Sequence, residues 1–594
     1  MTKADVALAG TNGFLPSDLR MEQWEDICPY FQELHEREIA DKADLRQWIL
    51  DKSELDAFLS EAFSWRYILL SLNSGDQQAV ENYHYAVQHI FPHMASFEQK
   101  LNQRLVHSAF LDHIRSSQYT TYLRLVKNAV QLFCEENVPI QTEIQLQTKE
   151  YGRIFSQMTI GVDGKQMTLQ KASVLLEEPD RDRRQQVYTK INERILQDTP
   201  ALESLFDELV RRRNQIARNA GFENFRDYAF RLLNRFDYQP EDCILLHQSI
   251  AHEILPILDE LNMARKEQLE LDQLRPWDLN IDASGDGPLH PFTDAEDLLS
   301  KGIECLSKIH PDFGRIISLM RERRMLDLES RPGKKPGGYN MPLQLTKLPF
   351  IFMNATQTLY DLRTLMHESG HAIHFYLTRN LELISSRRFP SEVSELAAMT
   401  MELLSMDHWH IFFPNEASLI RARINQLENV LKVLPWIATI DQFQHWVYTH
   451  PQHTREERKA EWLAILNRFS SNVVDYSGLE RYMEFLWHKQ LHIFEAPFYY
   501  IEYGIAQLGA IAIWKRYRET PAEAVKDYVR ALKLGHTCSI GAIYQAAGIE
   551  FRFDQEYIAE LARFVREEIR SLIDQLNAVH RNNASSSVRG NTAA

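Results

Sequence analysis

Cysteine is scarce in this chain, and no two cysteines stand at a short spacing. The 594 residues contain five of them: Cys28, Cys134, Cys243, Cys305 and Cys538. No Cys-x-x-Cys pair occurs, so the sequence indicates neither a disulfide framework nor a thiolate zinc site. Such cysteine usage favours a reducing compartment, and we expect a cytoplasmic protein.

Long hydrophobic runs and an excess of basic residues are also missing. No apolar stretch reaches the roughly 18 residues of a membrane-spanning helix, and residues 1–24 show no signal peptide. Acidic residues outnumber basic ones, 82 to 66, for a net charge of −16. An acidic surface opposes non-specific nucleic-acid binding. We therefore expect neither a membrane nor a nucleic-acid partner, whereas the oligomeric state is left open.

Helical periodicity dominates the rest of the chain, which predicts a mainly α fold. A short strand is expected at Leu348–Met353 and a hairpin at 155–169 that turns at Asp163-Gly164. The strand is either an ordinary core strand or an edge strand that pairs with extended peptides. Residues 275–292 are rich in Pro, Gly and Asp and predict a long loop, and 580–594 predict a disordered tail. We divide the chain into an N-terminal helical region (1–145), a catalytic region (146–579) and this tail.

The most informative motif is His367-Glu368-Ser369-Gly370-His371. Histidines four apart on a helix project from one face, so both imidazoles can bind one Zn²⁺, while Glu368 is left to act on a metal-bound water. Apolar flanking residues predict a buried helix, in which histidines need partners. Gly370 in mid-helix costs roughly 1 kcal/mol relative to Ala, which suggests a close backbone approach there.

A catalytic zinc site needs a third protein ligand and an open position. Position 377 is Leu, so no third histidine follows at the metzincin spacing. A later segment with helical periodicity carries three acids instead: Glu392, Glu395 and Glu402. Glu395 and Glu402 are two turns apart and share a face. One of the three is expected to be the third ligand, and another can orient a ligating histidine.

Other candidates are less specific. His374 lies on the same stripe as the two histidines and is a ligand, an orienting group or a packed core residue; Asp361 is a second orienting candidate. Downstream, His492, Tyr499 and Tyr503 lie in an aromatic segment that either packs in a core or donates hydrogen bonds to an oxyanion.

These motifs together resemble the oligoendopeptidase F and thimet oligopeptidase family of zinc peptidases, most closely oligoendopeptidase F. The similarity covers roughly residues 145–575. It implies Glu395 as the third ligand, Glu402 as the trailing acid, and His492, Tyr499 and Tyr503 as oxyanion donors. It also implies a large helical ellipsoid divided by a deep substrate channel, with a small β element beside a single zinc ion. Ser369-Gly370 departs from the usual middle of the motif.

The resulting hypothesis is a zinc-dependent endopeptidase acting on short unstructured oligopeptides. His367, His371 and Glu395 hold the metal, and Glu368 is the general base that later protonates the leaving amine. Two alternatives are a helical metallocarboxypeptidase, which would release single C-terminal residues, and a non-catalytic peptide-binding protein with structural zinc.

Overall fold

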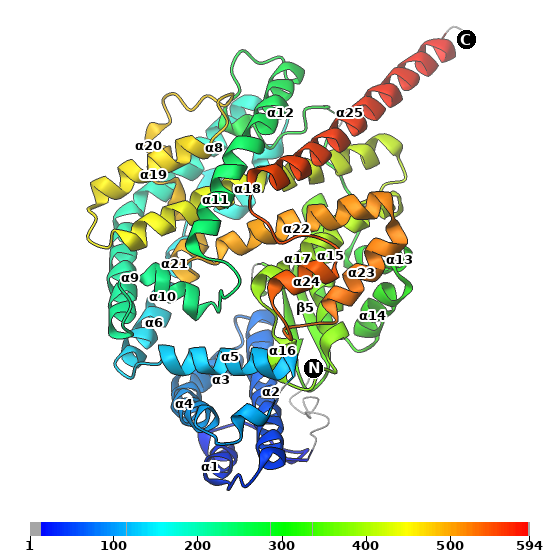
Figure 1. The fold of residues 1–594 in the computed structure, drawn as a ribbon. Coiled ribbons are helices and arrows are strands. Elements are labelled where there is room, and N and C mark those ends of the chain that lie inside the picture. The colour runs from blue at the N-terminus through cyan, green and yellow to red at the C-terminus, as the bar shows by residue number, and fades with distance from the viewer. Residues whose placement is uncertain (1–12, 115, 286, 336, 592–594) are drawn as a thin grey trace. The chain divides into compact units, whose positions relative to one another are not determined.

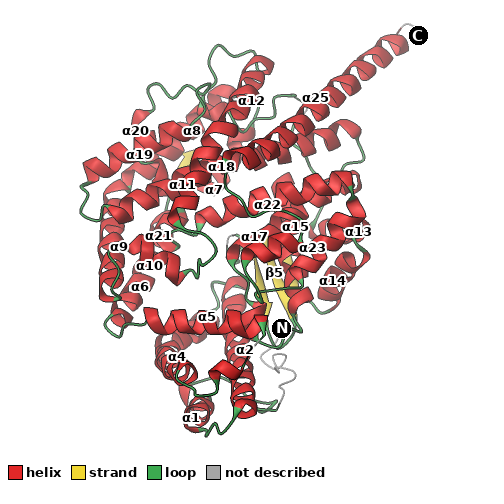
Figure 2. Ribbon diagram, in the orientation of Figure 1, coloured by secondary structure: helices red, strands yellow, loops and turns green. Residues whose placement is uncertain are grey.

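The described part of the chain, residues 13–591 without 115, 286 and 336, is mainly helical in the computed structural model (Figure 1, Figure 2). It divides into two units. The first comprises Met1–Gln131, His290–Ala422 and Gly509–Phe551, and the second comprises Leu132–Leu289, Arg423–Leu508 and Arg552–Ala594. This division differs from the linear boundary predicted at residue 145, because helices far apart in sequence pack together within each unit. Residues 1–12, at the start of the predicted N-terminal region, lie outside the described residues.

The first unit combines helices with one small sheet. Its helices are α1 (Cys28–Glu36), α2 (Lys42–Leu72), α3 (Gln77–Tyr85), α4 (Phe91–Val106), α5 (Ser117–Leu132), α13 (Ala295–Ile309), α14 (Pro311–Glu322), α15 (Leu359–Thr378), α16 (Ile384–Arg387), α17 (Ser391–Ser405), α23 (Pro521–Leu532) and α24 (Ile540–Ala546). Its strands are β3 (Leu326–Glu329), β4 (Tyr339–Leu343) and β5 (Leu348–Ala355).

The strand predicted at Leu348–Met353 is present as β5, and it is the central strand of its sheet. The order is β3-β5-β4, with β5 parallel to β3 and antiparallel to β4. Residues 348–353 are all buried, because β5 is paired on both sides and packs against α15. The edge-strand interpretation of this segment was therefore wrong, and β4 occupies an edge instead.

The second unit is built from helices and one hairpin. Its elements are α6 (Asn137–Ser156), β1 (Thr159–Val162), β2 (Lys165–Thr168), α7 (Leu169–Val174), α8 (Arg181–Gln197), α9 (Thr199–Asn219), α10 (Phe225–Leu232), α11 (Pro240–Glu253), α12 (Leu255–Gln268), α19 (Arg455–Phe469), α20 (Glu480–Met483), α21 (Leu491–Glu495) and α25 (Gln555–Asn591). Helices α18 (Glu416–Thr449) and α22 (Tyr500–Glu519) contribute residues to both units. Short 3₁₀ or π turns are η1 (Trp24–Asp26), η2 (Ala86–Ile90), η3 (Leu111–His113), η4 (Leu175–Glu177), η5 (Pro276–Asp278), η6 (Met406–Ile411) and η7 (Leu486–Lys489).

The predicted hairpin and its turn are confirmed, although its strands cover only residues 159–168 of the predicted range. Strands β1 and β2 are antiparallel, and Val162 pairs with Lys165. Asp163 and Gly164 have φ values of 51° and 75°, and two positive values are what a two-residue type I′ turn requires. In the predicted loop 275–292, the 3₁₀ turn η5 is the only helix or strand among the described residues.

The C-terminal segment differs from its prediction. Helix α25 continues to Asn591, into the range 580–594 for which we expect a disordered tail. Its earlier turns pack against α11, and the helix continues from that anchored part. Residues 592–594 of the predicted tail lie outside the described residues.

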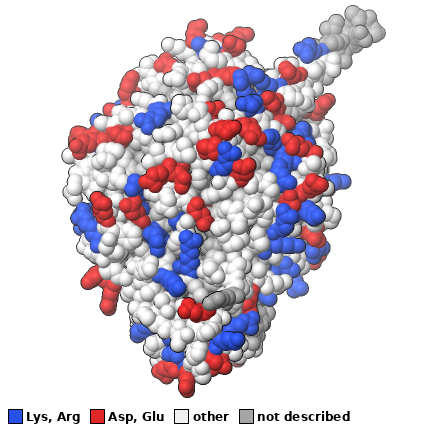
Figure 3. Space-filling model, viewed as in Figure 1, with Lys and Arg blue, Asp and Glu red and all other residues white. Residues whose placement is uncertain are grey.

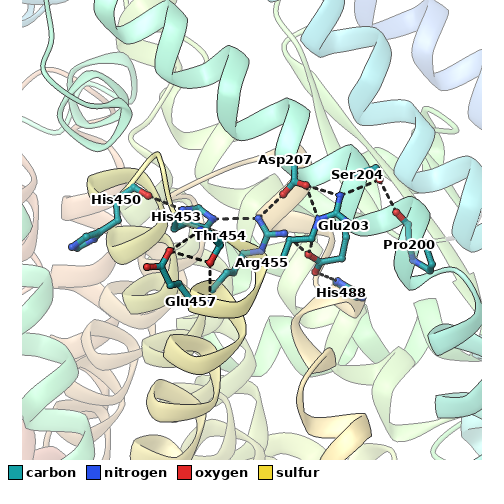
Figure 4. A network of polar contacts seen from close by, with 11 residues as sticks. Pro200, Glu203, Ser204, Asp207, His450, His453, Thr454, Arg455, Glu457 and His488 are labelled. Atoms are coloured by element: carbon teal, nitrogen blue, oxygen red, sulfur yellow. Dashed lines mark hydrogen bonds and ion pairs between the residues drawn. The ribbon is translucent and has the colours of Figure 1, made fainter.

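A buried polar network ties α9, α19 and η7 together in the second unit (Figure 4). Arg458 donates to Oδ1 of Asp207 at 2.7 Å and also to Glu203, whose Oε1 lies 2.9 Å from Nε2 of His488. Burial alone would raise the pKa of Glu203, but the bond to His488 and the charge of Arg458 hold it below its ordinary value. The network therefore keeps an ionised carboxylate inside the unit.

The face shown in Figure 3 carries both acidic and basic side chains, and basic ones gather along its right-hand side. Among the described residues, no helix combines the length and the apolar character needed to span a membrane. None of the five cysteines is in a disulfide.

Candidate active site

Helix α15, which carries the His-Glu-x-x-His motif, has a strong start signal. The Thr358 hydroxyl accepts from the backbone N–H of Asp361, and the Asp361 carboxylate accepts in return from that of Thr358 at 2.9 Å. The same carboxylate accepts from the N–H of Thr356 at 2.8 Å. Asp361 therefore caps its own helix, and an additional role in orienting a metal ligand stays a prediction. A capping box explains an acid in the first turn more simply than a contact with a ligand would.

The structure brings His367, His371 and Glu395 together. Nε2 of His367 lies 3.4 Å from Oε2 of Glu395, and Nε2 of His371 lies 3.9 Å from the same oxygen. All three ligand atoms fall within 4.8 Å of one another. Both histidines come from successive turns of α15, and Glu395 comes from α17, which packs along it.

Each histidine has a polar partner on its other ring nitrogen. Nδ1 of His367 lies 2.8 Å from Oε1 of Glu402, two turns after Glu395 on α17. Nδ1 of His371 lies 3.1 Å from the Ser394 hydroxyl. Such contacts leave Nε2 of both rings directed at the common centre, as ligating histidines require.

Ser394 was missed as a site residue in the sequence analysis. Helix α17 begins after Pro390 without a side-chain cap. Its position in the sequence could have identified it, because Ser394 directly precedes Glu395 and lies one turn after the start of the helix.

Gly370 explains how α15 and α17 approach each other so closely. A Cβ atom added there would lie 2.6 Å from the Ala397 carbonyl oxygen and 2.6 Å from Cα of Ala398. Real Cβ atoms essentially never show such contacts with backbone. The close approach predicted at this glycine is confirmed, and it sets the spacing between the helix with both histidines and the helix with Glu395.

The donor set fits a zinc ion. Two imidazole nitrogens and a carboxylate oxygen are typical ligands of catalytic zinc. Tetrahedral coordination at about 2.0–2.2 Å places neighbouring ligand atoms about 3.3 Å apart, close to the 3.4 and 3.9 Å measured here. Three protein ligands leave a fourth position for water or substrate.

Glu368 lies between the two histidines and is buried. Its Oε2 has no hydrogen-bond partner among the described residues. Burial raises the pKa of Glu368 to about 7, with further upward contributions from the Glu395 and Glu402 carboxylates. A carboxylate with this affinity for protons suits a general base that works near neutral pH.

The two histidines of the motif differ in protonation when no cation is bound. Burial opposes the charged form of His367, but its bond to Glu402 and the charge of Glu395 raise its pKa to about 10. Burial lowers the pKa of His371 well below its ordinary value, helped by the charge of His367. A divalent cation would therefore displace a proton chiefly from His367, since metals bind only the neutral imidazole.

His374 lies apart from this arrangement. Its ring is fully buried and stacks on Phe389 with centroids 3.5 Å apart. Neither ring nitrogen has a hydrogen-bond partner among the described residues, and burial lowers its pKa to about 3. His374 is therefore a neutral residue stacked in the core, and a role in orienting the metal ligands stays a prediction.

His492, Tyr499 and Tyr503 belong to the second unit and cluster with Tyr500. Tyr499 precedes α22, and its ring lies 5.3 Å from that of Tyr503 between centroids. The His492 ring lies 5.9 Å from Tyr503, and burial lowers its pKa to about 4. Ring contacts of Tyr503 with His492 and with Tyr499 hold the cluster together. The oxyanion-donor role of these residues stays a prediction from the sequence.

Known proteins resemble this chain over most of its length. Oligopeptidase PepF of Bacillus subtilis is 25% identical over 304 residues, covering 50% of this chain and 44% of its own. The chromosomal oligoendopeptidase F of Lactococcus lactis subsp. cremoris is 23% identical over 335 residues, covering 54% and 52%. The alignments thus span about half the length of these two relatives. A solved structure of PZ peptidase A with an inhibitor superposes with a TM-score of 0.86 at 25% identity, covering 92% of this chain and 97% of the other.

Family comparison covers both the site and the region before it. Residues 16–133 match the peptidase M3 N-terminal domain. Residues 174–563, which include α15, α17 and the tyrosine cluster, match peptidase family M3. Since this second match alone spans more than half of the sequence, the chain belongs to peptidase family M3.

Proposed function

We propose that this protein is a zinc-dependent endopeptidase that hydrolyses internal bonds of short, unstructured oligopeptides. The observation that carries the proposal is the convergence of His367, His371 and Glu395, with the buried carboxylate of Glu368 beside them. Membership of peptidase family M3 and similarity to oligoendopeptidases support the same chemistry. One catalytic zinc per chain accounts for the three ligands.

The proposed reaction depends on proton transfer by Glu368. Zinc held by the three ligands would supply Lewis acidity and lower the pKa of a water toward 7. Oε2 of Glu368, which accepts no hydrogen bond from the described residues, takes the proton as the peptide carbonyl is attacked. The same oxygen then gives the proton to the leaving amine. Glu402 and Ser394 keep both imidazoles oriented throughout.

Strand β4 is the proposed peptide-binding element of the first unit. It stands at an edge of its sheet, so its outer backbone groups can pair with an extended chain whatever the sequence. It is also linked to the site, because Nδ2 of Asn340 donates to the backbone carbonyl of Glu368 at 3.4 Å. Backbone pairing favours unstructured substrates. We propose that these are cytoplasmic oligopeptides.

Mass spectrometry of digested peptides tests this proposal. A mixture from short oligopeptides to a folded protein is incubated with wild type, Glu368→Gln and Glu556→Gln, with and without a chelator. Glu556 is exposed on α25 and serves as a matched control. We expect internal cuts in short peptides only, lost with chelator and in Glu368→Gln, although that variant keeps its zinc.

Each alternative has its own outcome in this experiment. Stepwise loss of single C-terminal residues would establish a metallocarboxypeptidase. A zinc-loaded wild type that cleaves nothing would establish the binding protein with structural zinc. Full activity in Glu368→Gln would refute the assignment of the general base.

A further inference from the structure

A second group of metal-ligating side chains lies in the second unit, on helices α11 and α18. Cys243 and His247 are four residues apart on α11, and Asp441 and His445 are four apart on α18. Each pair therefore projects from one face of its helix. Ligand atoms of Cys243, Asp441 and His445 all lie within 4.8 Å of one another. No residue of this group takes part in the chemistry proposed above.

The carboxylate of Asp441 is the centre of the group. Its Oδ2 lies 2.9 Å from Nε2 of His247, in hydrogen-bond geometry. It also lies 3.1 Å from Nε2 of His445, but without hydrogen-bond geometry. Oδ1 of Asp441 and both ring nitrogens of His445 have no hydrogen-bond partner among the described residues. Each of the two side chains thus has at least one atom available to coordinate a metal.

Burial makes these leftover atoms costly. Cys243, His247, Asp441 and His445 are all buried, with at most 6% of their surface exposed. Aromatic rings surround them: Phe498 lies 5.4 Å from His445 and Phe469 lies 6.4 Å from His247, between ring centroids. An unsatisfied polar group in such surroundings costs about 1–3 kcal/mol, and a buried charge costs more unless it is paired.

Charge balance favours a divalent cation there. Asp441 supplies a carboxylate, and Cys243 supplies a thiol that metal binding would deprotonate. One carboxylate and one thiolate would together neutralise a doubly charged ion. Sulfur, imidazole and carboxylate ligands suit zinc better than magnesium or calcium.

We propose that Cys243, Asp441 and His445 bind a second zinc ion that pins α11 to α18. Metal coordination would use the sulfur, Oδ1 of Asp441 and Nε2 of His445. His247 is a positioning residue, since its Nε2–H fixes the other carboxylate oxygen of Asp441. The site is structural: it is buried, takes a thiolate that the catalytic centre lacks, and joins two helices that are adjacent only in the fold. The metal content expected of the full-length protein rises from one zinc per chain to two.

Cobalt substitution tests the thiolate ligand without relying on activity. The full-length protein is stripped of metal, reloaded with Co²⁺ and examined by absorption spectroscopy. A thiolate-to-Co²⁺ charge-transfer band is expected in wild type and in Cys305→Ala, and absent from Cys243→Ala. Cys305 is a matched control because it is also buried but lies in the first unit. A wild type without this band, or a band that survives in Cys243→Ala, would overturn the proposal.

Metal analysis by mass spectrometry distinguishes the two centres. We expect two zinc ions in wild type and Cys305→Ala, and one in each of Cys243→Ala and His367→Ala. His247→Gln should keep both sites but bind the second ion on the order of 10–100-fold more weakly, as when other orienting groups are removed. If His367→Ala holds no zinc, the second site is refuted while the catalytic proposal stands; if it holds two, the catalytic assignment fails instead.

Discussion

Substitution of Gly370 by Ala probes how the spacing between α15 and α17 controls the metal centre. The added Cβ would lie 2.6 Å from two backbone atoms of α17, whereas ordinary contact begins at about 3.4 Å. The helices must therefore separate by about 0.8 Å at this point, because neither atom belongs to a flexible side chain. His367 and His371 flank Gly370 on one helix, and Glu395 lies on the other.

This displacement exceeds what a metal site tolerates. Metal–ligand distances are held within about 0.2 Å, so a shift of Glu395 by several times that value should weaken zinc binding on the order of 10–100-fold. The free energy of unfolding should change less than the zinc affinity does. Overpacking costs about 1–3 kcal/mol, and the better helix propensity of Ala returns about 1 kcal/mol. We expect a net loss of about 0–2 kcal/mol in the free energy of unfolding.

The assay pairs zinc affinity, measured by competition with a chromogenic chelator, with urea unfolding of the metal-free protein. Gly152→Ala is the control, since Gly152 is exposed in helix α6 and an added Cβ meets nothing within 4 Å. It should keep wild-type zinc affinity and gain about 0.5–1 kcal/mol of stability. Wild-type zinc affinity in a folded Gly370→Ala protein would refute the claim that this contact sets the ligand geometry.

Four further predictions concern single side chains. Glu402→Gln should weaken zinc binding about 10–100-fold in the same competition assay, and unchanged affinity would show that its contact does not orient the ligand. Tyr503→Phe should lower kcat about 10²–10³-fold in peptide hydrolysis, with Tyr500→Phe as the control; equal activity of the two variants would rule out the oxyanion role. Arg458→Met should cost about 3–5 kcal/mol in urea unfolding, because it removes the Arg458 charge from the buried Glu203 carboxylate, which keeps its contact with His488. Since folding lowers the pKa of Glu203, its contribution is present above its unfolded pKa of about 4.3 and is lost as pH falls through the folded value. Wild type should therefore lose more stability than Glu203→Gln between about pH 5 and pH 3, and parallel losses would contradict this.

The features that could be predicted from sequence are those that one helix or one turn determines. The four-residue spacing of His367 and His371, the seven-residue spacing of Glu395 and Glu402, and the turn at Asp163-Gly164 are local, and the structure has each of them. Gly370 is another such feature. Glycine lowers helix stability, so its presence in mid-helix predicted a close backbone neighbour, and the structure has Ala397 and Ala398 there.

Residues whose partners are set by tertiary packing were harder to assign. Asp361 and His374 share a helix with the histidines of the motif, yet one caps that helix and the other stacks in the core. Strand β5 is central because β3 and β4 pair with its two sides, and neither of these strands was predicted from the sequence. Cys243 and His445 are about two hundred positions apart, so a search for closely spaced cysteines could not connect them.

The residues proposed for zinc binding and those proposed for oxyanion stabilisation belong to different units. The groups proposed to bind and orient the catalytic zinc all belong to the first unit: His367, His371, Glu395, Glu402 and Ser394. The tyrosine cluster belongs to the second. Substitutions in the cluster should therefore lower turnover and leave zinc affinity unchanged, whereas Glu402→Gln should lower both. A Tyr503→Phe protein that also binds zinc more weakly would mean that the second unit helps to hold the metal, and the assignment of the ligands to one pair of helices would be incomplete.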